Sequence, residues 1–309
     1  MRIGVYLPFA VAAVLAVLAS RLAKHLTPRA ATLSLAGSAL VASVSWLGAL
    51  ALLAFSGFGQ IPVVALVGSW STSVLEAEDP VARTVAGICA VVLLATTVAL
   101  GLASWRRGRL LVAAFQECHR LPGDGELAVI DDARLEAFAL PGLPGRRGRV
   151  VVSTGMLRTL QGAEREALMA HERAHLRGHH HLYLLVLQLA AAACPLLRPL
   201  AKEGAFTIER WADEDAALAV GDRAVVARAL SRAALAKKGS HSHLGTLAAV
   251  GGPVPRRVRA LLAPSPKPRT TPLIVFALLL ALCCGGLAQA TQETQRMFDG
   301  AQDAYAASR

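Results

Sequence analysis

Four long apolar stretches constrain this chain more than any other feature of its sequence. They run over 3–19, 31–55, 85–105 and 272–290, and none contains a charged residue. The hydrocarbon core of a bilayer is about 30 Å thick, so a helix needs roughly 20 apolar residues to cross it. We therefore predict four membrane-spanning helices, three within residues 1–105 and a fourth at 272–290.

The first apolar stretch has an alternative interpretation as a secretory signal peptide. Arg2 precedes it and small residues end it, as in such a signal. However, Arg21, Lys24 and Arg29 follow the stretch, where a retained span carries its basic flank. We therefore expect an uncleaved membrane anchor.

The charges of the loops predict the orientation of the spans, because Lys and Arg are retained on the cytoplasmic side. Basic residues follow the first and third stretches and precede the fourth, whereas the loop after the second carries Glu76, Glu78 and Asp79. We therefore expect a multi-pass protein of the plasma membrane with its N-terminus outside. Residues 106–271 then form one cytoplasmic domain, and 291–309 form a short tail outside the cell.

The composition agrees with this arrangement and excludes nucleic acid as a direct partner. The formal net charge is +11, and residues 105–271 hold 25 Lys+Arg and 15 Asp+Glu, a net of +10. A basic domain can bind nucleic acid. Here aromatic residues make up only 5% of the chain, and they are not interleaved with the charges. Membrane topology and contact with anionic membrane lipid account for the basic residues near the span ends.

A helical pattern begins at Gly162 and contains His171-Glu172-Arg173-Ala174-His175, an HExxH motif. Residues four apart share one face of a helix, so both imidazoles can bind one zinc ion while Glu172 reaches a water molecule on that ion. The pattern by itself also fits two histidines on a solvated helix. The remainder of the site must therefore decide between these interpretations.

A catalytic zinc site needs a third protein ligand and one open position. Glu209 is one candidate, because Asp213 follows one helical turn later and can orient a ligand histidine. His181 is the other, because the motif HExxHxxGxxH also fits, with Gly178 breaking the helix. That longer motif is accompanied by a methionine turn, and no methionine lies between it and the fourth span. We therefore prefer Glu209.

The apolar run 182–197 could be mistaken for a fifth span. A single crossing there would place His175 and Glu209 on opposite sides of a membrane about 30 Å thick, and one metal ion could not bind both. We therefore expect a core helix or a helix that skirts the membrane.

Residues 137–142 and 148–155 are expected to form a strand, a turn and a second strand before the motif helix. Strands beside a protease cleft often pair with an extended substrate, although a plain structural hairpin fits the same pattern. The predicted fold is therefore mainly α, with four transmembrane helices and a cytoplasmic α+β domain that contains a small β-hairpin or sheet.

With these motifs the chain resembles the BlaR/MecR-type membrane zinc metallopeptidases, which are related to the HtpX-like ones. The matching pieces are 137–142, 150–155, HERAH at 171–175, Glu209 with Asp213, and 255–262, together with three spans before the domain and one after it. The resemblance implies one zinc ion on His171, His175 and Glu209, Glu172 as general base, and Asp213 in support. Members of that family are signalling proteases that cleave themselves or a cytoplasmic repressor.

Two departures from the family pattern bear on function. BlaR/MecR receptors carry an outside penicillin-binding domain after the last span, whereas only about 19 residues follow residue 290 here. We therefore expect no β-lactam sensing by this chain alone, and a partner could supply sensing. HtpX-like relatives usually have a longer, membrane-crossing insertion, whereas His175 and Glu209 are 34 positions apart here.

The sequence therefore predicts a membrane-embedded endopeptidase that hydrolyses peptide bonds with a zinc-activated water. Its expected substrate is a protein or peptide: itself or a cytoplasmic regulator such as a transcriptional repressor. Arg257 is a candidate oxyanion donor or salt-bridge residue, with His241 and His243 behind it, and simple solvation is the alternative for all three. A quality-control protease of the HtpX-like kind, or a signalling protein with a vestigial zinc site, remains an alternative.

Overall fold

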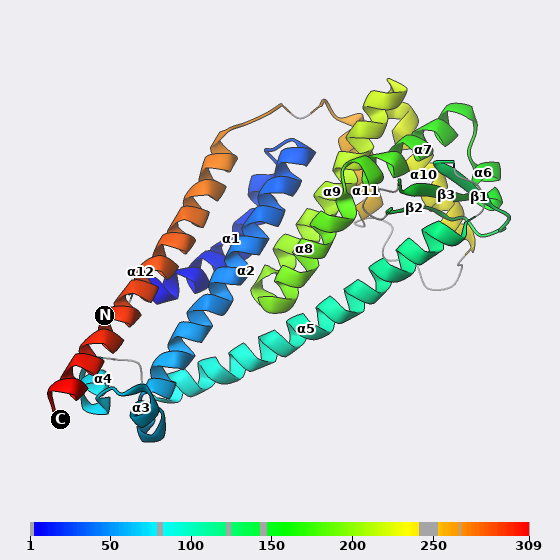
Figure 1. The fold of residues 1–309 in the computed structure, drawn as a ribbon. Coiled ribbons are helices and arrows are strands. Elements are labelled where there is room, and N and C mark those ends of the chain that lie inside the picture. Colours follow the sequence, from blue (N-terminus) through cyan, green and yellow to red (C-terminus); the bar gives the residue numbers. More distant parts are fainter. Residues whose placement is uncertain are drawn as a thin grey trace.

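The computed structural model describes residues 3–78, 83–121, 125–142, 147–240, 253–265 and 267–308. Figure 1 shows long helices that carry a group of shorter helices and strands at one end. Four helices in the described part are long and apolar enough to cross a membrane: Gly4–Ala23, Pro28–Gly59, Arg83–Arg120 and Thr271–Ala307. The predicted mainly α fold, with four candidate spans and a small sheet, is confirmed.

The first two candidate spans form an antiparallel pair. A short turn η1 (Ile3–Tyr6) leads into α1 (Leu7–Ala23), and α2 (Pro28–Gly59) returns beside it. Thr27 begins α2, because its hydroxyl accepts a hydrogen bond from the backbone N–H of Ala30 at 3.4 Å. With 32 residues, α2 is about 48 Å long, which exceeds the thickness of about 30 Å of a hydrocarbon core.

The other two candidate spans are longer than the predicted stretches. Helix α5 (Arg83–Arg120) has 38 residues and continues from the predicted span to the strands of the smaller group (Figure 1). Helix α12 (Thr271–Ala307) contains the predicted fourth span and most of the segment 291–309. The segment expected as a tail is therefore a direct extension of the last span.

At the far end of the spans, this extension packs against the loop between α2 and α5. That loop contains α3 (Pro62–Gly68) and α4 (Thr72–Glu78). The ring of Trp70 lies edge-on against Phe298 of α12, with 5.1 Å between centroids. The indole N–H of Trp70 donates to the carbonyl of Gly59 at 2.8 Å, which ties the loop to the end of α2.

The sheet has three strands in the order β1 (Leu127–Ile130), β3 (Arg149–Ser153), β2 (Ala137–Leu140). β1 is parallel to β3, and β2 is antiparallel to it. Every residue of the central strand is buried, as expected for a strand covered on both faces. The predicted hairpin of β2 and β3 is present, and β1 is a further strand that the sequence did not predict.

The predicted second strand was too long at its C-terminal end. The observed strand β3 ends at Ser153. The hydroxyl of Ser153 accepts a hydrogen bond from the backbone N–H of Met156 at 3.1 Å, so this residue caps the start of α6 (Thr154–Thr159). A Cβ at Gly155 would lie 2.3 Å from the carbonyl oxygen of Ala133, so only glycine fits this close turn.

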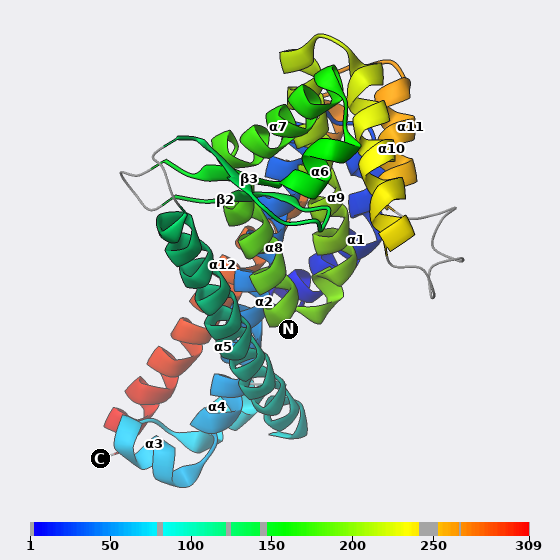
Figure 2. The same cartoon turned by 90° about the vertical axis from the view of Figure 1, so that its right-hand side faces the viewer.

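The remaining helices are α7 (Gly162–Arg177), α8 (His180–Ala193), the turn η2 (Pro195–Leu197), α9 (Arg198–Val220), α10 (Arg223–Ser240) and α11 (Pro253–Leu262). Helix α8 packs against α2 and α5, and α9 returns along α1 and α2 (Figures 1 and 2). With 14 residues, α8 is about 21 Å long, less than the thickness of the hydrocarbon core. The chain therefore passes down α8 and back along α9 as a helical hairpin.

A single apolar core joins this hairpin to the candidate spans. Leu187 of α8, Leu200 of α9 and Leu35 of α2 are fully buried in one cluster. Thr32 of α2 donates a buried hydrogen bond to the hydroxyl of Thr207 on α9, at 3.0 Å. The apolar run 182–197 is thus a core helix packed among the spans, and Glu209 returns to the side of His175.

Candidate metal centre and cleft

Helix α7 carries both histidines of the HExxH motif. It begins with a capping box, in which Gln161 and Glu164 each accept a hydrogen bond from the other's backbone N–H. His171 and His175 lie one turn apart on the same face, and their Nε2 atoms are 3.2 Å apart. The helix therefore presents two nitrogen ligands to one point.

Glu209 of α9 completes a set of three possible metal ligands. Its carboxylate oxygens lie 3.6 Å from Nε2 of His171 and 3.7 Å from Nε2 of His175. Two ligand atoms at normal zinc distances in a tetrahedral site are about 3.3 Å apart. The observed separations therefore fit a single zinc ion, and three protein ligands leave one tetrahedral position for substrate or water.

Asp213 and Arg257 bind the ligand residues and hold them in position. Nδ1 of His171 lies 3.2 Å from Oδ1 of Asp213, so this ring nitrogen donates to a carboxylate. Arg257 of α11 binds Asp213 with two hydrogen bonds, of 2.8 and 2.6 Å, and its Nη1 lies 2.8 Å from Glu209. Of the two roles considered for Arg257, the salt bridge is therefore present, and the oxyanion role stays a prediction.

The electrostatics keep the two supporting carboxylates ionised. Burial raises the pKa of Asp213, but hydrogen bonds from Arg257 and His171 outweigh it and hold the pKa at about 2. Burial likewise raises the pKa of Glu209, and the hydrogen bond from His171 and the charge of Arg257 lower it to about 2. Both groups are therefore anionic at neutral pH and suited to a cation.

The two histidines have different environments. Burial lowers the pKa of His171, but the carboxylates of Asp213 and Glu209 outweigh burial and raise it to about 9. Burial and the neighbouring His171 lower the pKa of His175 to about 4. A metal ion at this site must therefore displace a proton from His171, whereas His175 is already neutral.

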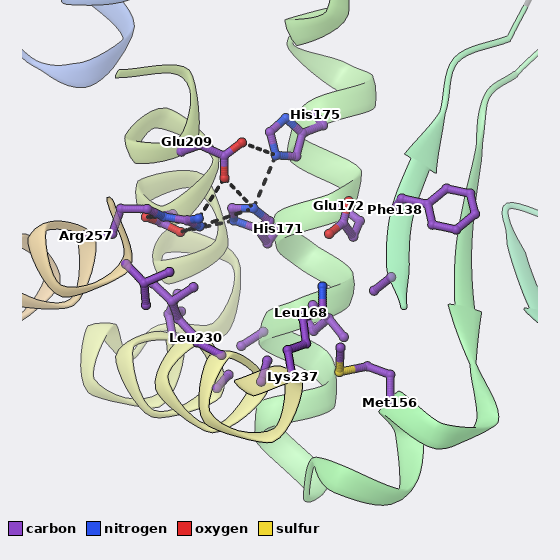
Figure 3. A pocket seen from close by; sticks show the side chains of 18 residues that line it. Phe138, Met156, Leu168, His171, Glu172, His175, Glu209, Leu230, Lys237 and Arg257 are labelled. Atoms are coloured by element: carbon purple, nitrogen blue, oxygen red, sulfur yellow. Dashed lines mark hydrogen bonds and ion pairs between the residues drawn. The ribbon is translucent and has the colours of Figure 1, made fainter. Parts of the chain in front are cut away.

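Glu172 stands beside the cluster without belonging to it. Its side chain is directed into the same cleft, opposite Phe138 of β2 (Figure 3). Only 8% of Glu172 is exposed, and burial raises the pKa of its carboxyl group. A carboxyl group whose pKa is shifted towards neutrality is better matched to accept and return a proton.

The cleft has a polar end and an apolar end within a cavity of about 390 Å³. The polar end holds the His171, His175 and Glu209 cluster. The apolar end lies between α7, α10 and the start of α6, where Leu168, Leu230 and Met156 line it and Lys237 lies beside them (Figure 3). Two residues of the edge strand β2, Ala137 and Phe138, form the rim.

The other histidines considered from the sequence have separate positions. His181, the rival third ligand, is not part of the ligand group that the structure brings together in the described residues. His241 and His243 lie outside the described residues. The sequence predicted no role for His180, whose Nδ1 lies 3.0 Å from Nδ1 of His175. The signal that could have found it is its spacing, five residues after a ligand histidine and directly after a helix break.

Comparison with protein families agrees with this geometry. Residues 104–234 match the model of peptidase family M48, and the match contains His171, His175, Glu209 and Asp213 but not Arg257. No match was found among curated proteins or among solved structures. M48 peptidases are zinc-dependent, and the His, His and Glu group has the donor set of such a site. Residues 104–234 are therefore similar to a peptidase family M48 domain, which supports metallopeptidase activity, in a chain with four helices suited to a membrane.

Proposed function

We propose that this chain is a membrane-embedded zinc endopeptidase, with one ion held by His171, His175 and Glu209. The observation that carries the proposal is the convergence of these three ligand atoms, which all lie within 4.8 Å of one another, in a cleft that Glu172 also lines. A vestigial site has no need of a buried carboxyl group directed into the cleft.

Zinc would supply Lewis-acid polarisation of the scissile carbonyl and would lower the pKa of a coordinated water to about 7. Side chains of the protein transfer the protons and hold the ligands in position. Glu172 accepts a proton from the attacking water and returns it to the leaving amine. Asp213 holds the ring of His171 through Nδ1, and Arg257 holds both Asp213 and Glu209 in place.

The cleft favours an extended peptide as substrate. β2 is an edge strand of the sheet, and its residues Ala137 and Phe138 line the cleft. An edge strand offers unpaired backbone groups to an extended peptide. A peptide bound there would place one side chain in the apolar end, where Leu168, Leu230 and Met156 would contact it.

Filling the apolar end is expected to change specificity. Ala233 of α10 lines it, and Ala233→Leu should lower kcat/KM for peptides with a large apolar residue next to the scissile bond at least about tenfold, with a smaller effect for alanine there. Leu235→Phe is the matched control, because Leu235 lies on the same helix and is 70% exposed. Hydrolysis of a peptide library by both variants measures the difference, and an unchanged preference in Ala233→Leu would contradict this use of the cavity.

We also propose that the domain faces the cytoplasm, with both termini outside, and that it cleaves itself or a cytoplasmic regulator such as a repressor. The distribution of Lys and Arg supports the orientation. Helix α2 supports a signalling role, because it connects the far loop with the helix that carries Glu209. At one end it accepts the hydrogen bond from Trp70 of the loop, and near the other end it donates a hydrogen bond to Thr207 of α9. A sensing partner could act at the far end of α2, where α3 exposes Val63 and Val67.

Metal analysis tests the proposed activity directly. The purified full chain in detergent is expected to contain one zinc per molecule and to hydrolyse a reporter protein. Removal of zinc with a chelator should abolish hydrolysis, and zinc should restore it where magnesium does not, because imidazole ligands favour zinc. Full hydrolysis by the zinc-free protein would refute the proposal.

A further inference from the structure

His180 is almost completely buried beside a candidate zinc ligand. It is 2% exposed, and its Nδ1 lies 3.0 Å from Nδ1 of His175, with the two rings nearly perpendicular. Nε2 of His175 faces the other ligands, His171 and Glu209. His180 therefore contacts the ring nitrogen of His175 that is directed away from the metal centre.

The fold holds His180 in this place by local and distant contacts. His179 adopts the left-handed conformation, with φ of 49°, which is uncommon for a residue with a side chain and turns the chain from α7 into α8. A Cβ at Gly178 would lie 2.4 Å from Nε2 of His180, so a glycine is required there. Trp211 of α9 packs against the ring from the other side, with 4.6 Å between centroids.

The hydrogen bond between the two rings determines which nitrogens carry protons. A neutral histidine that binds a metal through Nε2 carries its hydrogen on Nδ1. Nδ1–H of His175 then donates to Nδ1 of His180, which must accept and so carries its own hydrogen on Nε2. That Nε2 is buried and has no hydrogen-bond partner in the described structure. An unsatisfied buried group is costly, which argues that the contact with His175 has a function.

We propose that His180 is a positioning residue for the metal centre: it fixes the ring and the tautomer of His175 so that Nε2 is presented to zinc. His180 accepts a hydrogen bond from Nδ1 of His175, as Asp213 does from Nδ1 of His171. The difference is that the acceptor in His180 is uncharged. Most ligand histidines donate to a carboxylate, a carbonyl or water, and such partners strengthen metal binding. Arg257 pairs with both Asp213 and Glu209, so these three side chains together carry a net charge of −1.

The inference rests on the proposed zinc site and is tested by zinc affinity rather than by activity. His180→Leu removes the acceptor and is expected to weaken zinc binding about 10- to 100-fold, measured by competition with a chromogenic chelator. The same variant loaded with cobalt should show an altered visible spectrum, because the ring of His175 is free to turn. His180→Asn keeps an acceptor oxygen near the position of Nδ1 and should recover most of the affinity and the wild-type spectrum.

His181→Leu is the matched control, because it removes a neighbouring histidine that does not contact His175, and wild-type affinity is expected. Wild-type zinc affinity in His180→Leu would overturn the inference and leave the proposed function intact. Equal weakening in His180→Leu and His180→Asn would also overturn it, since packing alone would then explain the effect. Failure of the wild-type chain to bind zinc would overturn both proposals.

Discussion

Glu172→Gln is expected to lower kcat for peptide hydrolysis by about 10²- to 10⁴-fold, the usual contribution of a general base. The amide has nearly the shape of the carboxyl group but cannot accept the proton from water. Zinc content should stay at the wild-type level, because Glu172 is not in the ligand group. Glu166→Gln is the matched control: Glu166 is on the same helix, is exposed, and does not line the cleft.

The same variant identifies the substrate. A proteomic comparison of cells with the wild-type chain and with Glu172→Gln should reveal a cleavage product, of the chain itself or of a cytoplasmic regulator, that only the wild type forms. Hydrolysis at the wild-type rate by Glu172→Gln would remove Glu172 from the mechanism. Outputs that survive both this change and removal of zinc would favour the signalling protein with a vestigial site.

Asp213→Ala is expected to be the most damaging change for stability. It removes both hydrogen bonds from Arg257 to Asp213 and leaves the buried guanidinium paired with Glu209 alone, so the loss of unfolding free energy should approach the about 3–5 kcal/mol of a fully broken buried ion pair. It also removes the acceptor of His171, so zinc affinity should fall about 10- to 100-fold. Thermal unfolding with and without zinc and a chelator competition measure the two effects.

A double replacement separates these effects. In Asp213→Leu with Arg257→Met, apolar side chains of similar size replace this buried pair, and such replacements are often close to neutral. Glu209 also loses its partner Arg257, but 38% of its side chain is exposed, so water can solvate its charge. Stability should therefore largely recover, whereas zinc affinity should stay low because His171 still lacks its carboxylate. Recovery of wild-type zinc affinity in the double variant would show that Asp213 acts on folding alone.

The local part of the fold could be predicted from the sequence. The four candidate spans follow from uninterrupted apolar stretches, and the pairing of His171 with His175 follows from the period of one helix. The spacing of Glu209 and Asp213 by one turn is of the same kind. These features depend on residues close together in the chain, where helix geometry determines which side chains share a face.

Long-range packing decided the remainder. Whether Glu209 or His181 lies beside His175 depends on the hairpin of α8 and α9, whose core with α1 and α2 no local pattern reveals. β1 was missed because four residues give little periodic signal, and its pairing with β3 is what defines it.

The sequence by itself therefore determined four candidate membrane spans, an HExxH helix and Glu209 as a candidate third ligand. Only the tertiary structure decided which groups surround that helix. Arg257 reaches Asp213 across 44 positions of the chain, and His180 reaches His175 only because a left-handed residue turns the chain between them. Packing between distant segments sets such contacts, and the order of residues along one element does not contain them.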